Sequence, residues 1–156
     1  MEGFAALVGV ILVSLGLGTR QHLLWQADLL IRSLTITQEK GNLTARVVVA
    51  SESGEALSAR LEILLPVGVG IVTLGSGCKA GPSRTGISEL RARVECNLGN
   101  MPARSHRELY VVTTTPPPGV ARGFAVVAMS DTPDPRPANN FAERVIPPED
   151  QVDRAP

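Results

Sequence analysis

The stretch that decides the fold reads, in chain order, Leu65-Pro66-Val67-Gly68-Val69, then Cys78, then Val94-Glu95-Cys96-Asn97-Leu98-Gly99, then Asp134-Pro135-Arg136-Pro137-Ala138-Asn139-Asn140. Each piece is a turn former or a cysteine that stands between short apolar segments. Proline and glycine set the turns between strands, because they fix or free the backbone where the chain reverses. The stretch therefore predicts a module of many short strands, and it contains no recognisable reaction centre.

Apolar residues recur along the chain with the period of a β-strand. Residues 43–49, 57–65 and 90–98 each alternate between apolar and other side chains. Such alternation is typical of antiparallel strands that have one face on a core and one face in water. Further strands are expected at residues 30–37, 69–74, 108–114, 124–129 and 141–146, which makes about eight in total. The prediction is an all-β fold, an immunoglobulin-like antiparallel β-sandwich of about seven to eight strands.

Turn chemistry separates these segments. The four residues Glu39 to Asn42 include Gly41 and suit a tight hairpin between the first two strands. Residues 51–55 contain Gly54, which can adopt a positive φ. Residues 79–88 are predicted to form a polar loop, and the prolines at 116–118 end a strand because proline cannot continue a ladder.

The composition excludes several classes of function. The chain of 156 residues carries 15 Lys+Arg and 15 Asp+Glu, so it has no electrostatic footprint for nucleic acid. Hydrophobic residues make up 44% and aromatic residues 3%, which predicts an aliphatic core. A carbohydrate site would need exposed aromatic rings, and Tyr110 with Trp25 or Phe124 is the one combination we consider.

The N-terminal residues indicate export. Phe4 to Leu17 form an apolar run of about 14 residues, which is short for a membrane-spanning helix and typical of a signal peptide. Glu2 precedes the run and Arg20 follows it, whereas a standard signal has its positive charge in front. Two explanations are open: a true start codon upstream of Met1, or a segment that is retained as an uncleaved membrane anchor. We favour a cleaved signal peptide over an anchor. The expected division is an export segment with a linker at 1–27, a sandwich domain at 28–146 and a disordered tail at 147–156.

The two cysteines, Cys78 and Cys96, predict one disulfide in an exported chain. A pair of buried free thiols is the alternative. Their spacing is too wide for a CxxC redox or zinc motif, and His22 and His106 lie far away in the sequence. Because Cys96 is expected to face inward, a bridge to Cys78 would hold the 79–88 loop against the core. Closing a loop of about 18 residues contributes about 3 kcal/mol in the chain-entropy model.

The same motifs resemble a known family. Their order is similar to that of the conserved-repeat immunoglobulin-like domain of prokaryotic surface proteins (domain of unknown function, number eleven). The resemblance spans about residues 28–146, and residues 27–29 resemble the opening strand of the family. Two features depart from the family pattern: Ser51-Glu52-Ser53-Gly54 replaces its Asn-x-Gly turn, and the domain is present in a single copy. The resemblance implies an extracellular structural or adhesive module, and it supplies no catalytic residue.

One cluster of oxygen-bearing side chains is dense enough to consider as a metal site. Asp131, Asp134, Asn139 and Asn140 offer the carboxylate and carbonyl oxygens that Ca²⁺ prefers. The alternative is turn chemistry, in which these side chains accept hydrogen bonds from backbone amides beside the prolines. We favour the turn interpretation because the chain has no EF-hand spacing and no acidic excess, and we expect no metal and no cofactor.

The remaining candidate residues do not indicate an enzyme. His106 would need a nucleophile and an orienting acid, and no G-x-S-x-G elbow is present, so we interpret it as a solvated histidine. Arg60, Arg91 and Arg93 are expected to face outward, where the glutamates interleaved with them favour a mixed-charge surface over an anion-binding stripe.

The sequence predicts a non-catalytic structural or adhesive module that is secreted, periplasmic or on the cell surface. Its expected partners are proteins of the cell envelope or further copies of itself. The module would contact them through its loops or exposed strand edges. A module that binds carbohydrate or another small ligand is the alternative. No nucleic acid is expected as a partner, and a membrane contact is expected only if the N-terminal segment is an anchor.

Overall fold

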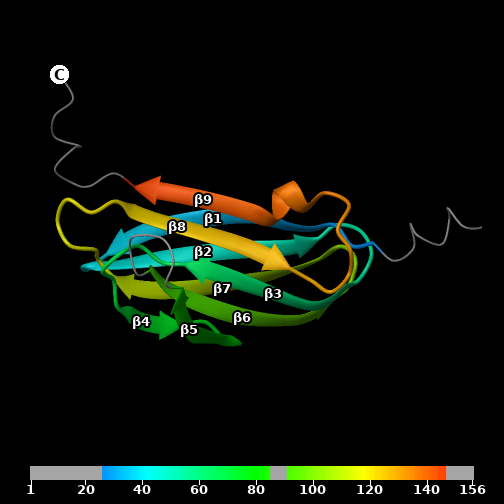
Figure 1. Ribbon diagram of the computed structural model, residues 1–156, viewed down its shortest axis with the longest axis horizontal. Helices are drawn as coiled ribbons and strands as arrows, with labels where there is room; N and C mark the ends of the chain where they lie inside the picture. The colour runs from blue at the N-terminus through cyan, green and yellow to red at the C-terminus, as the bar shows by residue number, and fades with distance from the viewer. Residues whose placement is uncertain (1–25, 85–90, 147–156) are drawn as a thin grey trace, which may run out of the picture.

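The computed structural model describes residues 26–84 and 91–146, which form nine strands and one short 3₁₀ helix (Figure 1). Residues 1–25 of the predicted export segment and linker at 1–27, the end of the predicted 79–88 loop and the predicted tail at 147–156 fall outside these residues. Among the described residues, no helix has the length and apolar character needed to cross a membrane. The elements are β1 (Leu29–Glu39), β2 (Asn42–Ser51), β3 (Ala56–Leu64), β4 (Ile71–Leu74), β5 (Cys78–Arg84), β6 (Arg91–Met101), β7 (Ser105–Thr114), β8 (Arg122–Met129), η1 (Pro137–Asn140) and β9 (Phe141–Ile146).

The strands form two antiparallel sheets that pack face to face. One, called sheet A, has the order β1-β2-β7-β4, and the other, sheet B, has the order β5-β6-β3-β8-β9. In immunoglobulin domains, strands A, B, E and D share one sheet and C, F and G share the other. β1, β2, β7 and β4 occupy the positions of A, B, E and D, and β3, β8 and β9 those of C, F and G. The predicted all-β, immunoglobulin-like sandwich is therefore confirmed.

β5 is the strand that the sequence interpretation missed. Residues 79–84 were expected in a polar loop, but they continue β5 and pair with β6, with Lys79 opposite Glu95 and Gly81 opposite Arg93. Gly81 and Pro82 disfavour a strand locally, and they are tolerated because β5 is the edge strand of sheet B. The prediction of a loop is wrong for these residues.

The core lies between the sheets and is mostly aliphatic, as the composition predicts. On β2 the alternation is confirmed, since Leu43, Ala45, Val47 and Val49 are each fully buried. On β3 it fails at one end, because the register shifts between Ala56 and Ala59 and Ser58 has a φ of 50°. This bulge buries Ala56 and leaves Leu57 39% exposed, so the predicted inward position of Leu57 is wrong.

Two turns depend on glycine. Lys40 and Gly41, with φ of 48° and 79°, join β1 to β2, and Glu39 pairs with Asn42 as a two-residue hairpin requires. Gly54 has a φ of 66°, and a Cβ there would lie 2.0 Å from the backbone oxygen of Gln26. At the second turn, the residues that precede β1 therefore lie directly against the loop between β2 and β3.

Candidate interaction face

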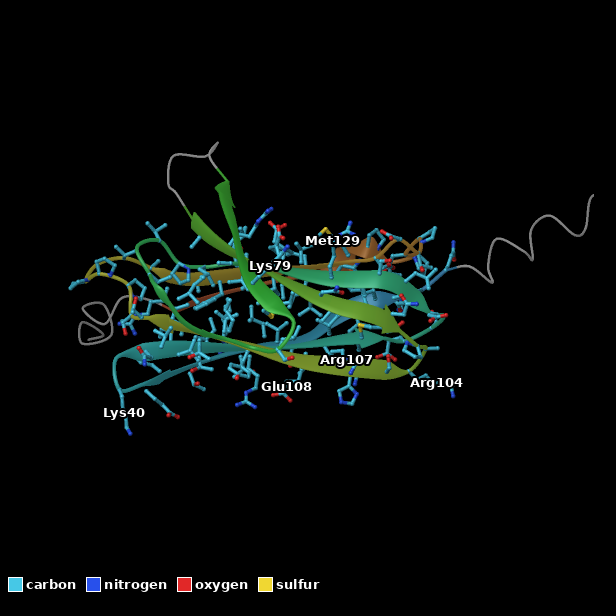
Figure 2. The ribbon with its side chains drawn as sticks, turned by 90° about the horizontal axis from the view of Figure 1, so that it is seen from below. Lys40, Lys79, Arg104, Arg107, Glu108 and Met129 are labelled. Atoms are coloured by element: carbon cyan, nitrogen blue, oxygen red, sulfur yellow. A yellow bond between two sulfur atoms is a disulfide. The ribbon has the colours of Figure 1, made fainter. Side chains whose placement is uncertain are left out.

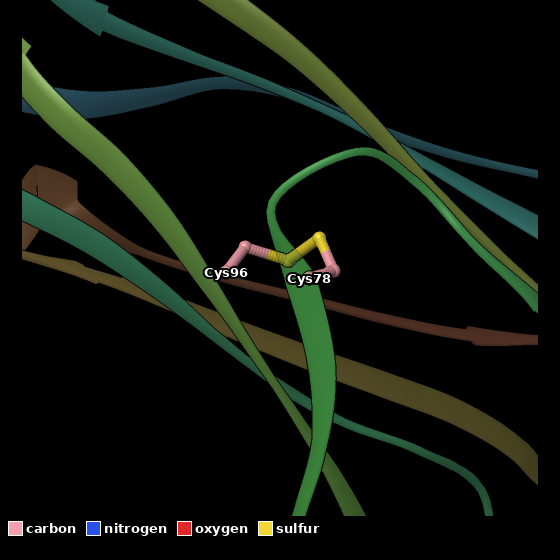
Figure 3. Close-up of a disulfide and its surroundings, with 2 residues drawn as sticks. All are labelled: Cys78 and Cys96. Atoms are coloured by element: carbon pink, nitrogen blue, oxygen red, sulfur yellow. A yellow bond between two sulfur atoms is a disulfide. The ribbon is translucent and has the colours of Figure 1, made fainter.

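The disulfide joins two neighbouring strands of sheet B (Figure 3). Cys78 opens β5 and lies directly opposite Cys96 on β6, with 3.9 Å between their Cα atoms. Cys96 is 1% exposed and faces the core, as predicted. The amide of Asn97 donates to the carbonyl oxygen of Gly77 at 2.9 Å, so the backbone continues the pairing beyond the bridge. The disulfide therefore attaches the edge strand β5 to its own sheet and does not connect the two sheets.

An open groove lies on the outer face of sheet B. Figure 2 shows the hairpin of β5 and β6 rising from this face, with Lys79 and Met129 on the same side and Glu108 on the opposite side of the sandwich. The groove has a volume of about 710 Å³. It is lined by Ser58, Arg60, Leu61, Glu62, Gly77, Lys79, Glu95, Cys96, Asn97, Gly99, Asn100 and Met129.

Ion pairs occupy the charged groups in and around this groove. Arg93 contacts Glu62 at 3.2 Å, with both side chains 11% exposed, and it also pairs with Glu95. Lys79 approaches Glu95 at 3.9 Å. Arg60, which also lines the groove, pairs with Asp131 at 3.5 Å. The predicted mixed-charge surface is confirmed for Arg60, whose side chain is 54% exposed. Arg93 pairs with glutamates as that prediction implies, but its side chain is mostly buried, and the side chain of Arg91 is outside the described residues.

The outer face of sheet B carries exposed apolar side chains along β9, the edge strand opposite β5. In the register of β8 and β9, Phe141 lies opposite Val127, Glu143 opposite Ala125 and Val145 opposite Gly123. Phe141 is 55% exposed and Val145 is 53% exposed. We call Phe141, Glu143 and Val145 the β9 triplet, since alternate residues of one strand share a face. It presents two apolar side chains with a carboxylate between them.

The β9 triplet lies on an edge strand. β9 is the last strand of sheet B and forms ladder hydrogen bonds only with β8 among the described strands, while β1 of sheet A packs close to it without pairing. In Figure 1 it runs along the border of the sandwich, away from β4 and β5. The backbone groups of such an edge, together with exposed apolar side chains, are the features through which sheets accept another strand.

The side chains of the Asp/Asn cluster, considered above as a calcium site and assigned to turn chemistry, make hydrogen bonds and an ion pair within the protein. Asp134 accepts the amide of Leu29 at 2.9 Å through Oδ2 and the amide of Arg136 at 2.7 Å through Oδ1. The second contact is an Asx turn, which was the favoured interpretation. Asp131 pairs with Arg60, as described above, and no group of three or more potential His, Cys, Asp or Glu ligands occurs within residues 26–84 and 91–146.

A residue outside the predicted cluster completes this arrangement. Asp28 is 1% exposed; its Oδ1 accepts Nδ2 of Asn139 at 2.9 Å and its Oδ2 accepts Nη2 of Arg136. We call Asp28, Asp134, Arg136 and Asn139 the Asp28 clasp, because they attach the start of β1 to the loop before β9. Asn140 makes no corresponding contact, and its buried Oδ1 has no hydrogen-bond partner among the described residues. No local pattern in the sequence points to the role of Asp28, because its partners are 108 and 111 residues away.

The other candidates do not assemble into a site. His106 is exposed on β7 and lies opposite Ala50. Tyr110 is 44% exposed on sheet A, where its opposite residue is Arg46, but Phe124 is fully buried. Trp25 lies outside the described residues. Tyr110 and Phe124 therefore do not form an exposed aromatic platform, and the exposed Phe141 belongs to the other sheet.

No family model matches the sequence, and no curated protein matches it either. Among solved structures, the chain is similar to an uncharacterized protein from Nocardia farcinica that is described as having an immunoglobulin-like fold. They are 14% identical with a TM-score of 0.38, over 79% of this chain and 83% of that chain. Another similar structure is GH20 exo-β-N-acetylglucosaminidase from Vibrio harveyi in complex with N-acetylglucosamine, with 13% identity and a TM-score of 0.33. That match covers 78% of this chain and 17% of the enzyme.

Proposed function

We propose that this chain is a non-catalytic, exported interaction module of the cell envelope that acts through protein–protein contacts. The observation that carries the proposal is the β9 triplet, in which Phe141 and Val145 are each more than half exposed on an edge strand. Exposed apolar side chains gathered on one strand mark contact surfaces more often than isolated ones do. The resemblance to prokaryotic surface domains supports the same role.

The disulfide supports an oxidising compartment. Disulfides persist in secreted, periplasmic and cell-surface proteins, and they are rare where glutathione keeps thiols reduced. Both cysteines of this chain are used in the Cys78–Cys96 bridge. The apolar run at Phe4 to Leu17 supplies a sequence signal for reaching that compartment.

The small-ligand alternative has less support. The groove beside β5 is open, and Glu62, Arg93 and Glu95 within or beside it are joined to one another in ion pairs. A ligand there would have to compete with those pairs, and stacking on sugars would require an exposed aromatic ring. The groove residues include no aromatic side chain.

The proposal is tested by expressing the full chain in a bacterial host and separating the cytoplasmic, periplasmic, membrane and external fractions. Free thiols are blocked at lysis, and the bridge is then assigned by mass spectrometry. We expect the protein outside the cytoplasm with Cys78 joined to Cys96. Protein that stays in the cytoplasm with two free thiols would contradict export. A variant lacking residues 4–17 is the control, and it should remain in the cytoplasm.

A further inference from the structure

The partner chemistry of β9 follows from the side chains of the β9 triplet. An added strand places its side chains opposite those of the edge strand, and opposite residues share a face. A strand that pairs with β9 therefore sets apolar residues opposite Phe141 and Val145. Between them, one residue of the added strand must lie opposite Glu143, which is exposed and forms no ion pair with any side chain of the described residues.

Self-pairing of β9 conflicts with this pattern. Two copies that meet antiparallel about a twofold axis at Glu143 would set Phe141 opposite Val145 of the second copy, which is favourable. The same register places Glu143 opposite Glu143 of the second copy, and like charges directly opposite are destabilising. A shift of two residues separates the glutamates but places each of them opposite Phe141 or Val145. The β9 edge therefore disfavours a second copy of this chain.

We propose that β9 accepts an extended segment of another protein with the pattern apolar–x–cation–x–apolar, the Lys or Arg lying opposite Glu143. This inference rests on the proposed function and names its partner by chemistry. The pattern is the same in both chain directions, so the side chains permit either orientation of the added strand. Backbone hydrogen bonds provide a sequence-independent part of the affinity, and the β9 triplet provides the selectivity.

The test uses two short synthetic peptides that alternate Thr with an apolar–charged–apolar triplet of Val, Lys and Val or of Val, Glu and Val. Binding to the ¹⁵N-labelled full chain is followed by NMR titration. We expect the lysine peptide to bind about fivefold more tightly than the glutamate peptide, with shifts confined to β8 and β9, because an opposite pair replaces a like pair. Glu143→Lys should reverse this preference, and added salt should reduce it because the pair is exposed.

Matched substitutions separate the edge from general surface effects. Val145→Ser removes an apolar side chain from β9, and Val72→Ser removes one of similar exposure, 50% against 53%, from the short edge strand β4. Val145→Ser should lower the affinity for the lysine peptide about threefold, while Val72→Ser should leave that affinity unchanged. Both positions are exposed, so both variants should fold, which circular dichroism checks.

Several results would overturn the inference. Equal affinities for the two peptides, an unchanged preference in Glu143→Lys, or shifts on another edge would do so. A wild-type dimer that Phe141→Ser dissociates in sedimentation would show that a second copy occupies β9 instead. Peptide binding that occurs only after removal of residues 147–156 would show that these residues, and not another protein, occupy the β9 edge. In these cases export and the disulfide would be unaffected, so failure of the inference is distinguishable from failure of the proposed function.

Discussion

The Asp28 clasp allows a sharp prediction about stability. Asp28→Ala removes a carboxylate that is 1% exposed, and it leaves Nδ2 of Asn139 without the acceptor that now lies 2.9 Å away. A hydrogen bond to a charged group contributes about 1.5–3 kcal/mol, and a partly buried donor left without its acceptor adds part of a desolvation penalty. The side chain of Arg136 is 68% exposed, so its lost ion pair is compensated by water. We therefore expect Asp28→Ala to lower the free energy of unfolding by about 3 kcal/mol.

Asp131→Ala is the matched control, because it also removes a carboxylate that forms an ion pair with an arginine. The side chains of Arg60 and Asp131 are 54% and 61% exposed and lie 3.5 Å apart. Exposed pairs of this kind contribute less than about 1 kcal/mol. Urea unfolding followed by circular dichroism at neutral pH measures both variants against the wild type. Equal losses in the two variants, or a neutral Asp28→Ala, would refute the reasoning that burial makes the clasp stabilising.

Three further predictions concern the bridge, a turn and the Asp/Asn loop. Cys78→Ala combined with Cys96→Ala should lower the free energy of unfolding by about 3 kcal/mol in urea, because the unfolded chain loses its cross-link; a change below about 1 kcal/mol would contradict this. Gly54→Ala should lower the free energy of unfolding by more than about 2 kcal/mol, because the new Cβ would combine a positive φ with a clash against Gln26. Gly99→Ala is the control: its φ is 67° but no atom lies within 4 Å of the new Cβ, so the loss should be only about 1 kcal/mol. Millimolar Ca²⁺ should leave the melting temperature as it is in chelator, since both carboxylate oxygens of Asp134 already accept backbone amides; a rise with Ca²⁺ would indicate binding to the folded state.

The strands were predictable wherever periodicity and turn chemistry agree. The alternation on β2 assigned its buried face correctly, and the Lys40–Gly41 hairpin followed from local backbone preferences. β5 was missed because Gly81 and Pro82 favour a loop locally, whereas the pairing with β6 is a tertiary interaction. Leu57 was misplaced because a bulge changes the side-chain period without a clear signal in the residues.

The candidate site was less predictable than the fold, for two physical reasons. The Asp28 clasp joins residues more than a hundred positions apart, and only the closed sandwich brings them together. On β9, apolar residues occupy both faces, with Phe141 and Val145 on one and Ala142 and Ile146 on the other. Periodicity alone could not decide which pair is buried, so the exposed apolar side chains became visible only in the structure.

The central claim is that the exported module makes its protein contacts through β9. The most direct measurement places a photo-reactive amino acid at position 145 on β9 in the exported full chain, and at position 72 on β4 as the control. After illumination of intact cells, we expect cross-linked adducts with another protein from position 145, lost in Glu143→Lys, and none from position 72. Adducts from position 72 alone, or equal adducts from both positions that persist in Glu143→Lys, would contradict the account.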